Sequence, residues 1–239
     1  MATRKPTRKR PDPTSALVRR LQKHASETIS DVLDVMGLPE QVLSATIRPV
    51  APGLRLAGPA FCVRGQAIDA DHPPVTIQYE VDRQLRPGCI VVMASDGYTG
   101  SALIGGNIAA SYRKRGCAGL VLHGAVRDPQ EIRSFLPAFA THATPRRPGG
   151  RWNVVAYGAP VAMPGQGDSE VVVHPGDLIL GDSSGVVVIP QAIVATVLDA
   201  ADKLVPLEKK VLADIRRGRD REQALKAHNR YGHIKRIVP

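Results

Sequence analysis

The sequence predicts a single α/β domain with a parallel sheet in its first half and many short strands in its second half. Residues 89–94 and 119–123 are continuous apolar runs, which are typical of strands buried on both faces, and a helical segment follows each of them. Strands and helices in alternation indicate βαβ units and hence a parallel sheet. The length of 239 residues fits one large domain with tails.

The first 37 residues predict a tail followed by two helices. Residues 1–13 combine Arg, Lys, Pro and Thr without any apolar period, so we expect a disordered basic tail there. A helix is expected from Thr14 or Ser15, either of which can cap it, and apolar residues then recur at helical spacing. A break is expected near Ser26, with a second helix beginning at Thr28 or Ser30, and Gly37 followed by Pro39 ends it.

From residue 47 onward the expected elements alternate, and they end in a long helix. In order they are strand-like residues 47–65, a helix at 75–85, a strand at 89–94, a helix at 105–115, a strand at 119–123 and a short helix from Asp128. Pro-Gly and Ser-Gly turns then separate short strands at 154–157, 171–173, 177–180 and 185–189. A helix at 191–217 completes a domain that we place at residues 14–218, and residues 219–239 are expected to form a basic C-terminal tail.

The net charge of +10 is concentrated at the two ends of the chain. Residues 1–20 carry +6 and residues 203–239 carry +7, whereas residues 21–202 carry −3. The central body therefore lacks the basic surface of a nucleic-acid-binding domain. Aromatic residues, which would stack on bases, make up only 4% of the chain. We therefore expect no nucleic-acid partner.

Cysteine usage and hydropathy predict a cytoplasmic protein. Cys62, Cys89 and Cys117 are odd in number and show no Cys-x-x-Cys spacing, which argues against a disulfide framework and against a zinc site. They are expected to be buried small apolar side chains in a reducing compartment. No run of 18 apolar residues is present, and the first twenty residues lack the apolar segment of a secretory signal, so we expect no membrane association.

Gly105-Gly106-Asn107 lies at the turn expected between the strand at 89–94 and the helix after it. Two glycines allow the backbone to approach a ligand closely, and a helix start offers free N–H groups to a carboxylate or a phosphate. The glycines could also serve the turn alone. The segment is not a P-loop, because no Gly-Lys-Ser/Thr follows.

Arg127-Asp128 follows the buried strand at residues 119–123. In open parallel sheets ligands bind at the carboxyl ends of strands, so this pair and the two glycines are expected to meet. Arginine offers a planar fork for a carboxylate, and aspartate offers a hard oxygen for Mg²⁺ or Mn²⁺. The alternative is that Asp128 caps the short helix after it and Arg127 is an ordinary surface residue.

A third group of turn residues lies in the second half of the chain. It comprises His174-Pro175-Gly176-Asp177 and the segment from Gly181 to Pro190, which reads Gly-Asp-Ser-Ser-Gly-Val-Val-Val-Ile-Pro. Its Pro-Gly and Ser-Gly turns predict a hairpin role.

In their order and spacing these three segments resemble the RraA-like family over residues 26 to 218, approximately. The matching elements are Gly105-Gly106-Asn107, Gly124-Ala-Val-Arg127-Asp128, Pro175-Gly176-Asp177 and the segment from Gly181 to Pro190. The family includes a metal-dependent aldolase acting on 4-hydroxy-4-methyl-2-oxoglutarate, which is also an oxaloacetate decarboxylase. It also includes the regulator of ribonuclease E activity.

The resemblance implies a compact α/β fold related to swivelling phosphohistidine-type domains, assembled as a homotrimer or homohexamer with sites at subunit interfaces. It implies a divalent metal, Mg²⁺ first and Mn²⁺ second, faced by Asp128, and a pyruvyl group bound by Arg127. A glutamate from the C-terminal helix of a neighbouring subunit completes the metal shell, and Glu208 matches it better than Glu222 does. The resemblance places the substrate carboxylate on the amides of Gly105, Gly106, Asn107 and Ile108.

One position departs from the family pattern. Aldolase members carry an acid in the turn, where it helps to place water for proton transfer, and this chain has Gly106 there. The departure puts aldolase activity in doubt more than it does the binding of metal and oxoacid. His123 and His142 are alternative proton carriers, although single histidines more often have structural roles.

The sequence therefore predicts an enzyme, a carbon–carbon lyase that acts on a 2-oxoacid through a pyruvate enolate, with Arg127 and Asp128 as its catalytic residues. Aldol cleavage and oxaloacetate decarboxylation share that enolate, which a Lewis-acidic cation stabilises. Two alternatives remain. One is a non-catalytic regulator that binds a ribonuclease, although a protein contact would not require the Arg127-Asp128 pair. The other is a dehydratase or lyase acting on a sugar-derived 2-oxoacid.

Overall fold

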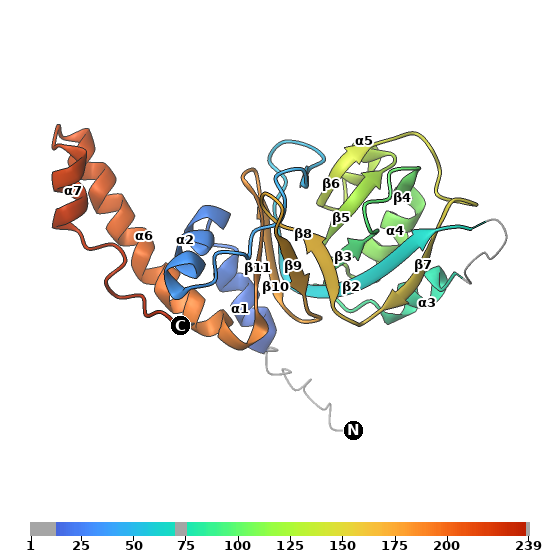
Figure 1. Cartoon of the computed structure of the whole chain (residues 1–239), viewed down its shortest axis with the longest axis horizontal. Coiled ribbons are helices and arrows are strands. Elements are labelled where there is room, and N and C mark those ends of the chain that lie inside the picture. The colour runs from blue at the N-terminus through green and yellow to red at the C-terminus, as the bar shows by residue number, and fades with distance from the viewer. Residues whose placement is uncertain (1–12, 70–75, 238–239) are drawn as a thin grey trace, which may run out of the picture.

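The computed structural model describes residues 13–69 and 76–237 (Figure 1). The tail expected at residues 1–13 therefore lies outside the described residues, apart from residue 13, with which the first helix begins. Within the described ranges, no helix is both long enough and apolar enough to cross a membrane.

The first half of the chain alternates between helices and strands, as its apolar periodicity predicts. Its elements are α1 (Pro13–Leu21), α2 (Ser26–Met36), β1 (Arg48–Pro49), β2 (Leu56–Ala67), α3 (Gln78–Gln84), β3 (Ile90–Ala94), β4 (Ala102–Ile104), α4 (Gly106–Lys114), β5 (Gly119–Val126) and α5 (Pro129–Ile132). The sequence did not predict β4, because three residues are too few to show a period.

The second half is rich in short strands and ends in helices. Its elements are β6 (Ala138–Ala143), β7 (Trp152–Tyr157), β8 (Val161–Pro164), β9 (Glu170–Val173), β10 (Leu178–Asp182), β11 (Gly185–Ile189), a short 3₁₀ helix (Gln191–Ile193), α6 (Val194–Arg216) and α7 (Arg221–Ala227). The four predicted strands and the long helix are present, whereas β6 and β8 were not predicted.

Nine strands of the described chain form one mixed sheet, whose main path runs β1-β6-β5-β3-β2-β10-β11. The central pairs β2–β3, β3–β5 and β5–β6 are parallel, and β4 also pairs with β5 in parallel. β1, β7, β10 and β11 pair in the antiparallel sense. The parallel part therefore belongs to the first half of the chain, apart from β6.

The sheet curls until its two ends approach each other. β1 contacts β11, and Arg48 Nη1 donates a hydrogen bond to the carbonyl of Ser184 at 3.0 Å. The result is a mixed α/β domain with a nearly closed, barrel-like sheet and a long C-terminal helix. The relationship to swivelling phosphohistidine-type domains stays a prediction.

Three apolar cores hold the layers together. One lies between the parallel strands and helices α3, α4 and α5, and includes the fully buried Tyr112. The second fills the inside of the curled sheet around Phe139. The third lies between β10 and β11 and helices α1, α2 and α6, which cover their outer face (Figure 1). The three cysteines are buried, as predicted.

The C-terminal segment, which was expected to be a tail, contains a helix that packs on α6. Asp220 caps α7 by accepting hydrogen bonds from the backbone N–H groups of Glu222 and Gln223. Ala224 is fully buried, and α7 packs back on the end of α6 (Figure 1). Ile237 N–H then donates to the carbonyl of Met36 at 3.0 Å. A seven-residue helix carries too little apolar period to be seen in the sequence.

Candidate functional site

The predicted site forms at the carboxyl ends of the adjacent parallel strands β4 and β5. Gly105 follows β4, and Arg127-Asp128 follows β5. The N–H of Gly106 donates to Asp128 Oδ2 at 3.1 Å, and Arg127 Nε donates to the same oxygen at 3.1 Å. The prediction that the two segments meet is therefore confirmed. The glycines follow β4, however, and not the strand at residues 89–94 as the sequence suggested.

A bulge in β5 sets the position of this strand end. The register of β5 against β6 shifts between Leu122 and Ala125. Gly124 lies inside the shift, and a Cβ at this position would come within 2.6 Å of Leu103 Cδ1 on β4. The missing side chain therefore allows β4 to lie close against β5, and the turn at Gly105 comes within reach of Asp128.

Asp128 has a left-handed backbone, with φ 60° and ψ 43°. Only one other non-glycine residue in the described ranges, Asp96, has a positive φ. Asp128 occupies the N-cap position of α5, but its carboxylate makes no hydrogen bond to that helix. The alternative that its side chain caps the following helix is therefore wrong, because this conformation directs the carboxylate to the start of α4 instead.

The Asp128 carboxylate is held in its ionised form. The hydrogen bond from the Gly106 N–H lowers the pKa of this carboxyl, and the Arg127 guanidinium lowers it further through a hydrogen bond and its charge. About a third of each side chain is exposed, 36% for Arg127 and 35% for Asp128. Both hydrogen bonds go to Oδ2, so among the described residues Oδ1 has no partner and is available to a cation or a solvent molecule.

The first turn of α4 leaves two backbone amides available. The internal ladder of the helix starts with Ala109 N–H, which donates to the carbonyl of Gly105 at 3.1 Å. Gly106 N–H is taken by Asp128, whereas the N–H groups of Asn107 and Ile108 make no hydrogen bond within the described chain. Such amides, together with the helix dipole, favour a bound anion.

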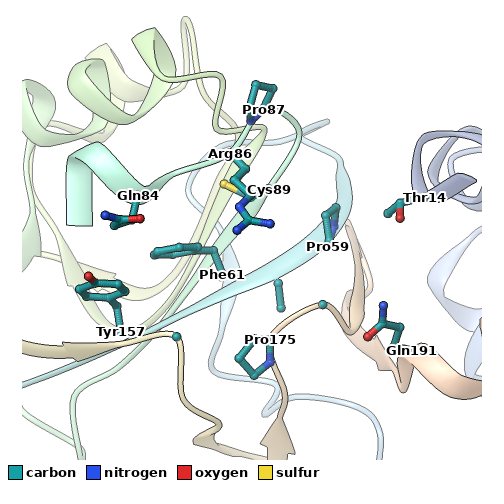
Figure 2. Close-up of a pocket in the computed structure, with 13 residues that line it drawn as sticks. Thr14, Pro59, Phe61, Gln84, Arg86, Pro87, Cys89, Tyr157, Pro175 and Gln191 are labelled. Carbon is teal, nitrogen blue, oxygen red and sulfur yellow. The ribbon is translucent and has the colours of Figure 1, made fainter. Parts of the chain in front are cut away.

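The site opens into a shallow cavity of about 350 Å³. It is lined by Arg127, Asp128, Pro129, Ala143, Thr144 and Pro145. A larger cavity of about 520 Å³ lies elsewhere, around Cys89 at the starting end of β3, and contains none of the predicted site residues. Figure 2 shows Phe61 between Arg86 and Tyr157, and the rings of Phe61 and Tyr157 stack 6.0 Å apart between centroids.

Comparison with known proteins identifies the family. A family model described as "RraA-like: Aldolase/RraA" matches residues 26–188. The chain belongs to the RraA-like family.

Relatives of the chain carry several names. It is 34% identical over 181 residues to a "Putative 4-hydroxy-4-methyl-2-oxoglutarate aldolase" of Halalkalibacterium halodurans, covering 73% of this chain and 77% of that one. It is 28% identical to the Protein DlpA of Legionella pneumophila over 87% of this chain, but spans only 33% of DlpA. The crystal structure of Streptomyces coelicolor RraAS2, titled an unusual member of the RNase ES inhibitor RraA protein family, matches with a TM-score of 0.74 at 27% identity. That match covers 87% of this chain and 100% of RraAS2.

Within one chain of this RraA-like protein, the two glutamates suggested as metal ligands do not join Asp128. Glu208 lies on α6, which runs away from the sheet on the side opposite α4, and it pairs with Arg230 (Figure 1). Glu222 pairs with Lys226 on α7 at 2.6 Å. In the described residues, no three His, Cys, Asp or Glu side chains are grouped so that they could hold a metal ion. Asp128 Oδ1 still fits a hard cation, because Mg²⁺ commonly takes one or two carboxylates and keeps several waters.

The two histidines considered as proton carriers have other surroundings. His142 is exposed, and its Nδ1 lies 2.8 Å from Thr141 Oγ1. Burial lowers the pKa of His123, which favours a neutral ring, and the carbonyl of His123 accepts a hydrogen bond from Ser95. Within the described chain, neither ring hydrogen-bonds to Arg127 or Asp128.

The sequence analysis missed Glu131. This residue lies in the first turn of α5, and its carboxylate stands over Gly106. A Cβ on Gly106 would lie 2.5 Å from Glu131 Oε2 and 2.9 Å from its Cδ. The signal available in the sequence was an acid three residues after Asp128, which indicates the same face of a short helix without showing what that face meets.

The third predicted segment is structural, as expected. Residues 178–189 form the β10–β11 hairpin. Asp177 joins its two ends, because Oδ2 accepts from His174 N–H at 2.8 Å and Oδ1 accepts from Gln191 N–H at 2.9 Å. Asp182 accepts hydrogen bonds from the start of α2.

Proposed function

We propose that this member of the RraA-like family is a divalent-metal-dependent lyase that breaks a carbon–carbon bond in a 2-oxoacid and releases pyruvate. The observation that carries the proposal is the convergence of three features at one strand end. They are the ionised Asp128, the guanidinium of Arg127 and the two available amides at the start of α4. The aldolase names of several relatives support it.

The chain's own groups are suited to bind and orient an α-oxoacid. The amides of Asn107 and Ile108 would receive the carboxylate, where the helix dipole favours negative charge. Arg127, which already donates to Asp128 through Nε, keeps its terminal N–H groups for the pyruvyl oxygens. These contacts would hold the acid beside Asp128.

Asp128 would hold a divalent cation, Mg²⁺ or Mn²⁺, through its carboxylate. When bound, this cation would supply the Lewis-acid charge that stabilises negative charge on the keto oxygen. In a homotrimer or homohexamer, Glu208 of a neighbouring subunit would add a second carboxylate. The pair of Glu208 with Arg230 would have to open for that role.

The proposed reaction is balanced without a further reactant. In a 4-hydroxy-2-oxoacid the C3–C4 bond breaks, its electron pair remains on C3 as the pyruvate enolate, and C4 becomes a carbonyl as its hydroxyl proton leaves. C3 then takes a proton, and pyruvate is released. Decarboxylation of oxaloacetate would give the same enolate. The fixed positive charge of Arg127 would offset the charge that develops on the enolate.

A pyruvate-release assay tests the proposal. Candidate substrates are 4-hydroxy-4-methyl-2-oxoglutarate, oxaloacetate and 4-hydroxy-2-oxopentanoate, each supplied with Mg²⁺, with Mn²⁺ or with a chelator. We expect metal-dependent turnover that falls about a thousandfold in Asp128→Ala, equivalent to ~4 kcal/mol of transition-state stabilisation. The control Glu170→Gln removes an exposed carboxylate on β9 and should leave turnover unchanged.

Two results would overturn the proposal. One is pyruvate release that survives both the chelator and Asp128→Ala. The other is the absence of pyruvate from every substrate with the native oligomer and either metal.

A regulator of a ribonuclease is the second candidate, because the match to RraAS2 covers the whole of that protein. A pull-down with a ribonuclease of the RNase E type would test it. A regulator would bind equally well with Asp128→Ala, since the protein contact would not depend on this carboxylate.

A further inference from the structure

The cavity of about 520 Å³ around Cys89 lies at the opposite end of the parallel strands from Asp128. Cys89 comes directly before β3, whereas Arg127-Asp128 follows β5, which pairs with β3 in parallel. None of the residues that form the strand-end site lines this cavity. A ligand bound here would therefore leave the place proposed for the 2-oxoacid free.

A tight turn holds Arg86 at this cavity. The carbonyl of Arg86 accepts a hydrogen bond from the N–H of Cys89 at 3.2 Å, with a Pro-Gly pair between them. Gly88 has a φ of +84°, which the third position of a type II turn requires and which glycine adopts without strain. The N–H of Gly88 also donates to the carbonyl of Gly116 at 2.8 Å, just before β5. The backbone of Arg86 is therefore fixed, and its side chain lies at the cavity wall.

The charge of the cavity favours an anion. Among the described residues that line it, Arg86 is the only charged one, and no acid is present to neutralise it. The guanidinium makes no hydrogen bond or ion pair within the described chain. Figure 2 shows it beside Phe61, on the side away from Tyr157. A free guanidinium presents a planar fork of N–H donors that a carboxylate can accept with both oxygens.

The backbone of the cavity offers little to a phosphate group. The N–H of Gly158 already donates to the carbonyl of Cys62 at 2.9 Å, and the N–H of Gly176 donates to the carbonyl of Ala60 at 3.0 Å. The N–H of Cys89 closes the turn described above. Phosphate sites in proteins use several free backbone N–H groups together. A carboxylate, with its single charge, fits the one guanidinium better.

Two aromatic rings form one wall of the cavity. Phe61 on β2 and Tyr157 on β7 are half-buried, and their planes are 14° apart. The hydroxyl of Tyr157 donates to Glu80 Oε1 at 2.6 Å, so its ring is held in place. Pro59 and Pro175 extend the apolar lining (Figure 2). This wall is suited to a flat apolar group, because aromatic rings pack favourably against one another in stacked or edge-to-face geometry.

We propose that this cavity binds an aromatic monocarboxylate, whose carboxylate pairs with Arg86 and whose ring packs against Phe61. The volume lies in the range of cavities that enclose small organic ligands. The side-chain amides of Gln84 and Gln191 make no hydrogen bond within the described chain and lie on opposite sides of the cavity in Figure 2, where they can bind polar groups on the ring. The site does not depend on the proposed lyase activity.

Calorimetry on the full-length protein in its native assembly tests this proposal, with 2-naphthoate as the probe. We expect 2-naphthoate to bind, and the uncharged 2-naphthamide and inorganic phosphate to bind at least about tenfold more weakly. Arg86→Gln should weaken 2-naphthoate binding about thirtyfold, because a charge-assisted hydrogen bond is lost. Arg83→Gln is the matched control. It removes the same charge from α3, outside the cavity lining, and should change the affinity by less than about twofold.

A second variant tests the contact with the ring. Phe61→Leu keeps an apolar side chain but removes the aromatic face. It should weaken 2-naphthoate binding about fivefold and should affect the saturated analogue, decahydro-2-naphthoate, much less. Because Phe61 packs against the core between the sheet and helices α3 to α5, a melting curve of the same sample shows whether the variant is folded.

Several results would overturn the proposal. Equal weakening in Arg86→Gln and Arg83→Gln would indicate general attraction to positive charge. Equal binding of 2-naphthoate and 2-naphthamide, tighter binding of phosphate, or no binding of 2-naphthoate at millimolar concentration would contradict the ligand class. Asp128→Ala and saturating pyruvate should leave 2-naphthoate binding unchanged, and displacement by pyruvate would place the ligand at the strand end instead. None of these results bears on the proposed lyase activity, which pyruvate release measures separately.

Discussion

The starts of helices α2 and α4 are built in the same way but differ in their surroundings. Each helix begins at a residue whose N–H donates to an aspartate from elsewhere in the chain. Ser26 N–H donates to Asp182 Oδ2 at 2.8 Å, and Gly106 N–H donates to Asp128 Oδ2 at 3.1 Å. Asp182 is only 6% exposed, whereas about a third of the Asp128 side chain is exposed to solvent.

The two carboxylates also differ in how completely they are bonded. Asp182 Oδ1 accepts from the hydroxyl of Ser26 at 2.7 Å and from Ser184 N–H at 3.1 Å, so both of its oxygens are used. In the part of the chain that the structure describes, Asp128 uses Oδ2 alone. A buried carboxylate with every oxygen bonded holds two elements together, whereas one with a free oxygen at an exposed strand end can also bind a ligand.

Asp182→Ala should have the largest effect on stability. It leaves three donors near the start of α2 without their acceptor, which would cost about 3 kcal/mol and lower the melting temperature by roughly 6–12 °C. Asp128→Ala should lower it less, because water can reach the Gly106 N–H. Calorimetric melting of both variants checks this. Equal decreases in melting temperature would contradict the view that Asp182 is structural and Asp128 is not.

Arg127→Lys should have the next largest effect. It should weaken binding of the 2-oxoacid and leave the stability of the fold unchanged. Lysine keeps the charge but loses the planar fork, so KM for the 2-oxoacid should rise about thirtyfold, equivalent to ~2 kcal/mol. Steady-state kinetics and a melting curve on the same sample provide the measurement. A normal KM together with a lowered melting temperature would show that Arg127 stabilises Asp128 and does not bind the substrate.

Acidification should have the smallest effect of the three changes, and this effect should be on the stability of the fold. The folded state lowers the pKa of Asp128, so the stabilisation from its charge is present above the ordinary carboxyl range and is lost as the pH falls through the lowered pKa. Because the site is partly exposed, the difference between wild type and Asp128→Asn should be only about 0.5 kcal/mol, or ~1–2 °C. It should shrink in melting curves as the pH falls below the ordinary carboxyl pKa of about 4. A gap that stays constant on acidification would contradict this assignment.

The elements with long apolar patterns, and the meeting of the two functional segments, could be predicted from the sequence. Buried strands such as β3 and β5 show continuous apolar runs, and parallel strands end at one edge of a sheet. That is sufficient to bring Gly105 and Arg127-Asp128 together. Strands β4, β6 and β8 and helix α7 are short, and each is completed by pairing with or packing on another element, which its own few residues do not reveal.

Only the tertiary structure decided which groups face each other at the site. The direction of the Asp128 carboxylate follows from its left-handed backbone, and no pattern of residue types encodes that choice between α4 and α5. The place of Glu131 over Gly106 depends on the bulge at Gly124 and on the register of β4 against β5. Spacing along a chain determines the face of an element on which a side chain lies. The group that it meets depends on how separate elements pack, which no local pattern records.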